Sequence, residues 1–327
     1  MKYILIILLF FCTCISMISF NFFIKHQRKK RVGQSIRGLG PETHLIKSGT
    51  PTMGGILLIF NTILIYFIFC LVFKKYLSID IFKSILILFP LIGFGVIGFI
   101  DDFLIIKKHN NIGLKPTHKF LLELFVSAVY YFIYLINFVN NELNFFGTYI
   151  DLGFMYGVML LLLLSGFTNA TNFTDGLDGL LGLNGIISFL FIGIYSYLIN
   201  NYHVLLISII VIFVLISFLS FNLPKATIFM GDTGSLALGG LMISSLVSMN
   251  AEVLILFFGF IYFVEIFSVI LQVWYFKKTK GQRIFKMSPL HHHFEICGLS
   301  EMKINLLFCF INFVFSSIGL WIGISFL

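Results

Sequence analysis

Charged residues are scarce in this sequence of 327 residues. Asp, Glu, Lys and Arg make up 11% of it, whereas 59% is hydrophobic and 42 residues are Phe. An ordinary soluble domain has roughly 25% charged residues. A soluble fold could not hide so much apolar surface, so lipid must cover it. The shortage of charge therefore excludes the soluble two-domain protein that the length alone would suggest.

Three further absences narrow the class. Polar residues do not alternate with apolar ones along the apolar runs, which excludes a transmembrane β-barrel. The five cysteines have no spacing typical of zinc, haem or a disulfide framework. The excess of positive charge lies in loops between apolar runs, so it does not indicate nucleic acid as a partner. We predict an all-α, polytopic integral membrane protein surrounded by the lipid bilayer.

The sequence contains ten apolar runs that could each cross a bilayer, which takes about 20 residues. The first is followed by a basic segment and has no small-residue cleavage site, so we interpret it as a retained span rather than a signal peptide. No repeat or linker divides the chain, and residues 1–327 are expected to form a single transmembrane domain. The ten runs lie at residues 3–23, 56–73, 81–100, 119–138, 153–168, 180–199, 203–221, 234–250, 253–275 and 304–326.

The distribution of Lys and Arg predicts the orientation of these spans. All of the 22 Lys and Arg residues except Lys2, Lys74, Lys75 and Lys83 lie on odd-numbered connections between the runs. Cytoplasmic loops carry the excess of basic residues in membrane proteins. The odd-numbered connections are therefore expected to be cytoplasmic, with both termini extracytoplasmic.

Five polar stretches also fall on the expected cytoplasmic connections, whereas the outer loops are short and chemically bland. Transporters usually place polar groups near the middle of the bilayer, along a central pathway. Polar residues gathered at one membrane face instead indicate chemistry on a lipid headgroup with a soluble co-substrate. We therefore expect an active site at the cytoplasmic face.

The first stretch, residues 47–55, contains Lys47 and ends with Gly54 and Gly55 at the start of the second span. Free N–H groups at a helix start, with a lysine nearby, can hold an anion. The alternative is an ordinary glycine- and proline-containing helix start with the usual cytoplasmic positive charge.

The second stretch places Asp101 and Asp102 at the expected C-terminal end of the third span. The helix dipole opposes negative charge there, so a cation or nearby lysines should compensate. Adjacent helical residues point about 100° apart, so the two acids are expected to have different partners. Two solvated interfacial acids are the alternative.

The third stretch, residues 168–180, repeats Asn169, Asn172, Asp175 and Asp178 at intervals of three residues. An ideal α-helix would not keep all four on one side. We interpret the pattern as a helix end that unwinds so that its polar groups converge on one point, with no lysine to neutralise the acids. Amides and carboxylates suit a hard cation or a sugar phosphate; a capped polar turn is the alternative.

The fourth stretch runs from Asn222 to Ser235 and places Asp232 just before the eighth span. An acid at that position is either a ligand or a plain helix cap. Gly231 and Gly234 would let a ligand approach the backbone closely. Phe229 can stack on a base or dip into the membrane interface.

The fifth stretch has three consecutive histidines, residues 291–293. Zinc ligands usually skip residues, and no cysteine completes a set, so we favour recognition of phosphate or sugar over a zinc site or an inert loop. Two acids inside spans, Glu123 and Glu265, are expected to partner a lysine or a hydroxyl. Gln272, also inside a span, lies near enough to the cytoplasmic end to reach the site.

Together these stretches resemble the cytoplasmic motifs of the phospho-N-acetylmuramoyl-pentapeptide transferase family, in that family's order. They read KSGTPTMGG, GFIDD, TNATNFTDGLDGL, FNLPKATIFMGDTGS and RIFKMSPLHHHFE, and the resemblance runs from Val32 to Lys303. It implies a bacterial inner-membrane enzyme that transfers phospho-N-acetylmuramoyl-pentapeptide from UDP-N-acetylmuramoyl-pentapeptide to undecaprenyl phosphate. The resemblance further implies release of UMP, a requirement for Mg²⁺ and, on family grounds alone, a homodimer.

The resemblance also implies roles for individual residues. Asp101, Asp102 and Asp232 are expected to be catalytic, and Asp232 and Asp175 to bind the metal. The expected substrate-binding residues are Lys47, Thr52, Lys115, Asn172, Asp178, Asn222, Phe229, Gln272, His291 and His292. A polyprenyl-phosphate N-acetylglucosamine 1-phosphate transferase would share the acids but carry a different histidine loop. A cation-coupled transporter, the other rival, would need polar groups at midplane depth and an inverted repeat.

Overall fold

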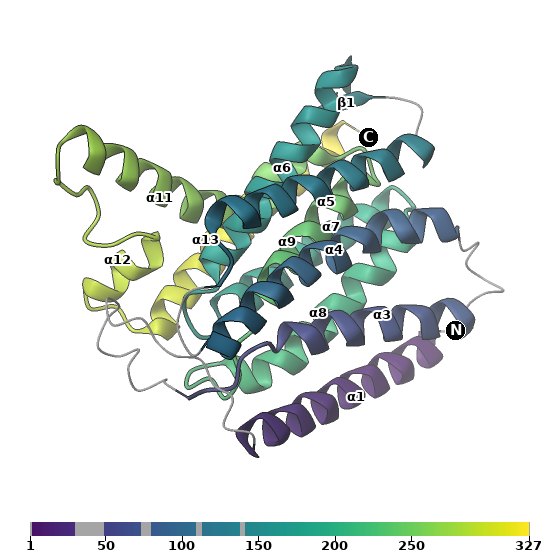
Figure 1. Cartoon of the computed structure of the whole chain (residues 1–327). Helices are drawn as coiled ribbons and strands as arrows, with labels where there is room; N and C mark the ends of the chain where they lie inside the picture. The colour runs from purple at the N-terminus through teal and green to yellow at the C-terminus, as the bar shows by residue number, and fades with distance from the viewer. Residues whose placement is uncertain (1, 30–48, 73–79, 109–112, 138–140, 327) are drawn as a thin grey trace.

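The computed structural model describes residues 2–29, 49–72, 80–108, 113–137 and 141–326, and these ranges form a helical bundle with one short hairpin (Figure 1). The helices are α1 (Lys2–Lys29), α3 (Gly55–Val72), α4 (Ile81–Lys108), α5 (Pro116–Asn137), α6 (Phe154–Thr174), α7 (Leu180–Leu198), α8 (Tyr202–Asn222), α9 (Gly231–Val247), the 3-10 helix η1 (Glu252–Leu254), α10 (Ile255–Phe258), α11 (Phe260–Lys278), α12 (Leu290–Ile296) and α13 (Glu301–Ser325). The strands are β1 (Glu142–Phe145) and β2 (Thr148–Asp151).

Nine helices within these ranges are long and apolar enough to cross a membrane, which confirms a polytopic membrane protein. They are α1, α3, α4, α5, α6, α7, α8, α11 and α13. The expected run at 234–250 corresponds to α9, which has only 17 residues and is not among the nine. Every residue of α9 from Thr233 to Val247 is buried inside the protein.

The side chains are distributed as expected for a protein whose surroundings are lipid. On α3, Phe60 and Phe67 are exposed, whereas Asn61 and Thr62 are buried. Asn61 donates a hydrogen bond from Nδ2 to Oγ of Ser19 on α1, 2.9 Å away. The side chains of Asn61 and Thr62 therefore point into the bundle, and those of Phe60 and Phe67 point outward.

Glycines bring the start of α9 into direct backbone contact with α3 and α4. A Cβ atom on Gly98 of α4 would lie 2.2 Å from the carbonyl oxygen of Asp232. A Cβ on Gly55 of α3 would lie 2.1 Å from the backbone nitrogen of Gly234. Small residues allow such close helix packing in membranes, and here they fix the position of Asp232 relative to α4.

Several expected boundaries are wrong. Helix α4 continues to Lys108, so Asp101 and Asp102 lie inside the helix rather than at its C-terminal end. Helix α6 extends to Thr174 instead of ending at residue 168. The expected run at 253–275 is broken at Gly259, between α10 and α11.

The all-α prediction is also wrong at residues 142–151, which form an antiparallel hairpin. Glu142 pairs with Asp151, and Phe145 pairs with Thr148. The two loop residues, Phe146 and Gly147, have φ angles of 50° and 81°. Two positive φ values in a two-residue loop are typical of the type I′ turn, whose twist matches the flanking strands.

The ends of the described chain lie on the same side as the hairpin, whereas α12 lies at the opposite end of the bundle (Figure 1). The rings of Phe146, at the hairpin tip, and Phe326, near the C-terminus, have centroids 5.8 Å apart. The polar stretches described below lie near the α12 end, far from the hairpin.

Candidate active site

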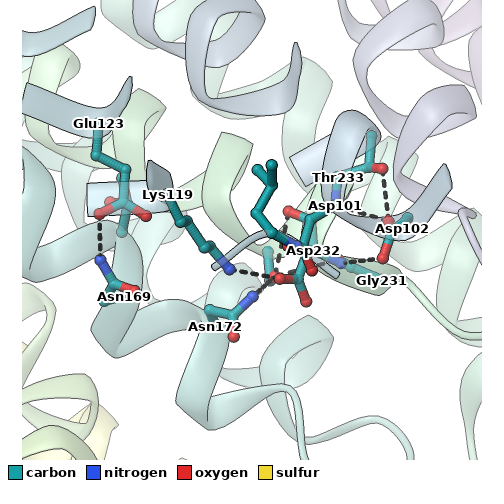
Figure 2. Close-up of polar contacts among 12 residues, drawn as sticks. Asp101, Asp102, Lys119, Glu123, Asn169, Asn172, Gly231, Asp232 and Thr233 are labelled. Atoms are coloured by element: carbon teal, nitrogen blue, oxygen red, sulfur yellow. Dashed lines mark hydrogen bonds and ion pairs between the residues drawn. The ribbon is translucent and has the colours of Figure 1, made fainter. Parts of the chain in front are cut away.

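Carboxylates carried by three helices lie close together, and Figure 2 shows three of them, Asp101, Asp102 and Asp232. Asp101 and Asp102 come from α4, Asp175 follows the last residue of α6, and Asp232 lies in the first turn of α9. Asp101 and Asp232 lie within hydrogen-bonding reach of each other. The predicted catalytic and metal-binding acids are therefore brought together, although they are far apart in the sequence.

Asp102 holds the start of α9. Its Oδ1 accepts a hydrogen bond from the Asp232 N–H at 3.1 Å, and its Oδ2 accepts from the Thr233 N–H and hydroxyl at 3.0 and 2.6 Å. A carboxylate at a helix N-terminus satisfies free N–H groups and interacts favourably with the helix dipole. Asp102 thus caps a neighbouring helix, and both of its oxygens are engaged.

Asp101 has different partners, as expected for adjacent helical residues. Its Oδ1 accepts a hydrogen bond from the Leu114 N–H at 2.7 Å. Gly113 lies directly against this carboxylate, because a Cβ there would be 2.5 Å from Oδ1. The segment before α5 therefore folds around Asp101, while the same side chain also reaches Asp232.

Asp175 lies half-buried beside this group of acids and accepts a hydrogen bond from the Gly231 N–H. Burial raises its pKa well above the ordinary value, and the charges of Asp232 and Asp102 raise it further. The cause is an excess of negative charge in a confined space. A cation arriving beside Asp175 would relieve this repulsion.

Lys119 supplies a positive charge that the sequence reasoning missed. Its Nζ lies 2.5 Å from Oδ2 of Asp232 (Figure 2). The third stretch itself has no lysine, and the nearby lysine expected for Asp101 and Asp102 is Lys119, which comes from the first turn of α5. A signal was present in the sequence: Lys119 precedes Glu123 by four residues, so the two share one helix face.

Glu123 extends the polar contacts behind Lys119. Its Oε2 accepts a hydrogen bond from Nδ2 of Asn169 at 2.6 Å, and Asn169 also donates to the carbonyl oxygen of Ser165. Asn172, one turn further along α6, donates from Nδ2 to Oγ of Ser235 at 3.1 Å.

The expected convergence of the four polar side chains of the third stretch is met in part, because Asn172 and Asp175 both bond to α9 whereas Asn169 and Asp178 bond elsewhere. Asn169 bonds to α5 and Asn172 to α9, as described above. Asp178 accepts a hydrogen bond from the Ala226 N–H at 2.9 Å, in the loop before α9. Only Asp175 joins the carboxylates of α4 and α9.

Asn222 fixes two loops to one another. Its Oδ1 accepts from the Gly179 N–H at 3.0 Å, and its Nδ2 donates to the carbonyl oxygen of Ile228 at 2.8 Å. Phe229, next to Ile228, is half-buried and pairs through its backbone with Pro51 and Gly54. The hydrogen bonds of Asn222 and Phe229 therefore hold the loops around the site in place.

The helix-start N–H groups expected to hold an anion are occupied. Gly54 donates to the carbonyl oxygen of Phe229, and Gly55 donates to that of Met230, both at 2.9 Å. The expected role of Gly231 and Gly234 is also wrong, because their open sides face protein rather than a ligand. A Cβ on Gly231 would lie 2.5 Å from Oδ2 of Asp102.

The remaining predicted substrate residues occupy different places. Thr52 is buried, and Lys115 is exposed just before α5. Lys47 lies outside the residues that the structure describes.

The triple-histidine segment forms the short helix α12 and is anchored on α11. His291 is fully buried, and its Nδ1 lies 3.2 Å from Oε2 of Glu265. Nδ1 of His292 lies 3.2 Å from Oε2 of Glu295. Gln272 forms hydrogen bonds with the loop backbone at Ile284 and Phe285.

No three His, Cys, Asp or Glu side chains form a ready-made metal cage among the described residues. The donor chemistry nevertheless fits Mg²⁺. That ion typically takes one or two carboxylates, keeps several waters and binds substrate phosphates. Asp232 and Asp175 provide hard oxygen donors in a cluster whose negative charge Lys119 only partly balances.

Comparison with known proteins gives consistent matches. Residues 84–250 match the family described as Glycosyl transferase family 4, and residues 47–59 match the phospho-N-acetylmuramoyl-pentapeptide-transferase signature 1. The phospho-N-acetylmuramoyl-pentapeptide-transferase of Staphylococcus carnosus (strain TM300) is 41% identical over 99% of this chain and 100% of that protein. Those of Staphylococcus aureus (strain bovine RF122 / ET3-1) and Staphylococcus epidermidis (strain RP62A) are 39% and 40% identical, each over 91% of this chain and 92% of its own length.

Proposed function

The chain belongs to the phospho-N-acetylmuramoyl-pentapeptide-transferase family, and from this premise we propose the reaction that it catalyses. It is a membrane transferase that moves phospho-N-acetylmuramoyl-pentapeptide from UDP-N-acetylmuramoyl-pentapeptide to undecaprenyl phosphate. UMP is released, and the product is the first lipid-linked intermediate of peptidoglycan synthesis.

The observation that carries the site assignment is the pairing of Lys119 with Asp232 inside the group of carboxylates. Donor and acceptor both carry phosphate groups and repel each other. A site for their reaction needs positive charge where they meet, because charge builds up on the phosphate oxygens in the transition state. Lys119 provides it, and bound Mg²⁺ would supply further charge neutralisation through Asp232 and Asp175.

The chemical step breaks one P–O bond and forms another. An oxygen of the lipid phosphate attacks the sugar-linked phosphorus, and the electron pair of the broken bond leaves on UMP. Asp101 is the candidate to orient the lipid phosphate or accept its proton. It lies within reach of Asp232, and of its two carboxylate oxygens Oδ1 alone accepts the hydrogen bond from Leu114. Asp102 acts through α9, since its oxygens hold the backbone that carries Asp232.

Substrate recognition is assigned to the surrounding polar segments. We propose that Lys47, Thr52, Lys115, Phe229 and the histidine segment face the nucleotide donor. The contacts of Asn172, Asp178, Asn222 and Gln272 keep the nearby loops in the shape that the donor meets.

We also propose how the chain is oriented in the membrane. The protein has ten spans if α9 is counted, both termini outside, and the carboxylates at the cytoplasmic face of the bacterial inner membrane. The shared location of both chain ends, opposite α12, supports this arrangement. A homodimer is expected from the family alone.

The test is release of UMP by purified protein supplied with a polyprenyl phosphate, Mg²⁺ and either UDP-N-acetylmuramoyl-pentapeptide or UDP-N-acetylglucosamine. We expect turnover with the muramoyl donor and little with the other. Preference for UDP-N-acetylglucosamine would instead identify a polyprenyl-phosphate N-acetylglucosamine 1-phosphate transferase. No UMP from either donor, together with cation-driven solute uptake by proteoliposomes, would favour a transporter.

A further inference from the structure

Glu265 is a buried acid that the proposed reaction does not use directly. It lies within α11, its side chain has 0% exposure, and it is not part of the carboxylate group around Asp232. An ionisable residue inside a membrane span is unfavourable unless it is paired, and it usually serves a function. Its partners therefore indicate what it does.

Both oxygens of Glu265 face the start of α12. Oε2 accepts a hydrogen bond from the Leu290 N–H at 2.9 Å, and Oε1 accepts from the His291 N–H at 3.2 Å. Oε2 also lies 3.2 Å from Nδ1 of the His291 ring. One carboxylate therefore bonds to the backbone at the start of α12 and lies beside the imidazole of His291.

Gln272 holds the other arm of the same loop. It lies seven residues after Glu265, on the same face of α11. Its Oε1 accepts hydrogen bonds from the N–H groups of Ile284 and Phe285 at 3.1 and 3.0 Å, and its Nε2 donates to the Phe285 carbonyl oxygen at 3.0 Å. Helix α11 thus supports the connection to α12 at two points.

The Nε2 side of the His291 ring packs against the turn that follows Asp175. Its Nε2 is buried and has no hydrogen-bond partner among the described residues. A Cβ on Gly176 would lie 2.2 Å from this nitrogen, so the ring rests on the backbone that follows Asp175. The imidazole is therefore held between Glu265 on one side and the Asp175 turn on the other.

We propose that Glu265 is a positioning residue that fixes the start of α12 and the buried His291 ring against the Asp175–Gly176 turn, and so sets the shape that this turn presents to the nucleotide donor. This inference rests on the proposed function, in which the histidine segment faces that donor. In Glu265→Gln the side chain would offer a single acceptor oxygen to the two backbone N–H groups of Leu290 and His291. Its NH₂ group would then face one of those N–H groups, and no hydrogen bond can form between them.

The experiment measures kcat and KM for both substrates in wild type, Glu265→Gln, His291→Ala and the double variant. We expect Glu265→Gln to lower kcat/KM for the muramoyl donor by about 10- to 100-fold, the loss of a charge-assisted hydrogen bond. The effect should appear mainly in the KM for the donor, with the KM for the lipid phosphate unchanged. In the His291→Ala background, Glu265→Gln should cost only about twofold more, because coupled residues are not additive.

Glu252→Gln is the matched control, since it alters another buried acid on the hairpin side of the protein and should retain wild-type KM values. A second variant, Gly176→Ala, displaces the ring from its other side with Glu265 intact, and should raise the KM for the donor as well. It keeps the proposal testable if Glu265→Gln fails to fold.

Three results would overturn the inference: wild-type kinetics in Glu265→Gln, full additivity with His291→Ala, or a lower kcat with both KM values unchanged. If Glu265→Gln does not fold, an unchanged donor KM in folded Gly176→Ala would overturn it too. A wild type that releases no UMP from the muramoyl donor would instead refute the proposed function, so the two failures are distinguishable.

Discussion

The Nζ atom of Lys119 lies 2.5 Å from Oδ2 of Asp232, which joins the first turn of α5 to the first turn of α9. The Asp232 side chain is 27% exposed, whereas Asp101 and Asp102 are buried. A phosphate that approaches Asp232 through a metal ion would therefore meet the lysine at the same point. The contact places a positive and a negative group together at the point where we propose that the two anionic substrates react.

Replacing Lys119 with Met should lower kcat by about 100-fold, the scale of losing one key electrostatic group in an active site. Met largely retains the shape of the lysine side chain, so the decrease in kcat measures the effect of removing the positive charge. UMP release by the purified variant measures it. Lys107→Met, an exposed lysine near the end of α4, should behave as wild type. Equal activities in the two variants would remove Lys119 from the proposed site.

Asp232→Asn should reduce activity by about 100-fold or more and weaken the dependence on Mg²⁺, because the amide keeps the shape but loses the charge. The thermal midpoint should change little. Titration of activity with Mg²⁺ tests metal binding. Asp80 caps α4 through the Phe82 N–H at 2.9 Å, at the opposite end of the protein, and Asp80→Asn is the control. Near-normal turnover in Asp232→Asn would limit that residue to its ion pair with Lys119.

Gly98→Ala should destabilise the protein, since a Cβ there would lie 2.2 Å from the backbone oxygen of Asp232. Forcing an extra carbon into a packed contact typically costs about 1–3 kcal/mol. A lower thermal midpoint and a parallel loss of activity are expected, because α9 must shift. Gly166→Ala is the control, as no atom lies within 4 Å of the added carbon. Equal midpoints for the two variants would contradict the packing described.

Stability should fall with increasing pH because of Glu252. Burial raises the pKa of this carboxyl from 4.5 to about 7, and it accepts a hydrogen bond from the Tyr156 hydroxyl at 2.5 Å. Between these two values the folded protein holds a proton that the unfolded chain has lost, so stability declines across this window. Above pH 7 this group lowers the free energy of unfolding by about 3 kcal/mol relative to its value below pH 4.5.

Glu252→Gln removes this titration and keeps an acceptor for Tyr156. Thermal midpoints of wild type and variant, measured from pH 4 to 8, should diverge as the pH rises, with the variant less affected. Parallel curves would show that Glu252 does not titrate differently in the folded protein.

The proposed orientation can be tested by cysteine labelling in intact cells. In a variant whose five native cysteines are replaced, Thr148→Cys in the hairpin should react with an impermeant maleimide added outside. Lys115→Cys should react only after the membrane is opened. Labelling of position 115 from outside would invert the topology.

The sequence predicts the helices well because lipid imposes a strong constraint: a chain in hydrocarbon must satisfy its own backbone hydrogen bonds. The different partners of Asp101 and Asp102 also follow from local helix geometry. The boundary of α4 does not, because polar residues such as Asp101 interrupt the apolar run while the helix continues around them. The hairpin was missed because its strands have only four residues each.

The contacts within the site were harder to predict, because they join distant segments. Asp102 and Thr233 are 131 residues apart, and nothing near either one indicates that the acid caps α9. Gly54 and Gly55 look like an anion site until Phe229 and Met230 are seen to occupy their N–H groups. Local patterns identify which residue types are functional, whereas tertiary packing decides which of them meet.

The burial of α9 has a consequence for how the protein is made. A segment of 17 residues whose sides are covered by other helices has no lipid-facing surface of its own from Thr233 to Val247. Its glycines and serines give it little tendency to remain in hydrocarbon without neighbours. During biosynthesis this segment should therefore settle only once α3, α4 and α6 are present to receive it. Asp232 then reaches its place only after those helices have packed together, so a misassembled chain would lack the proposed reactive centre.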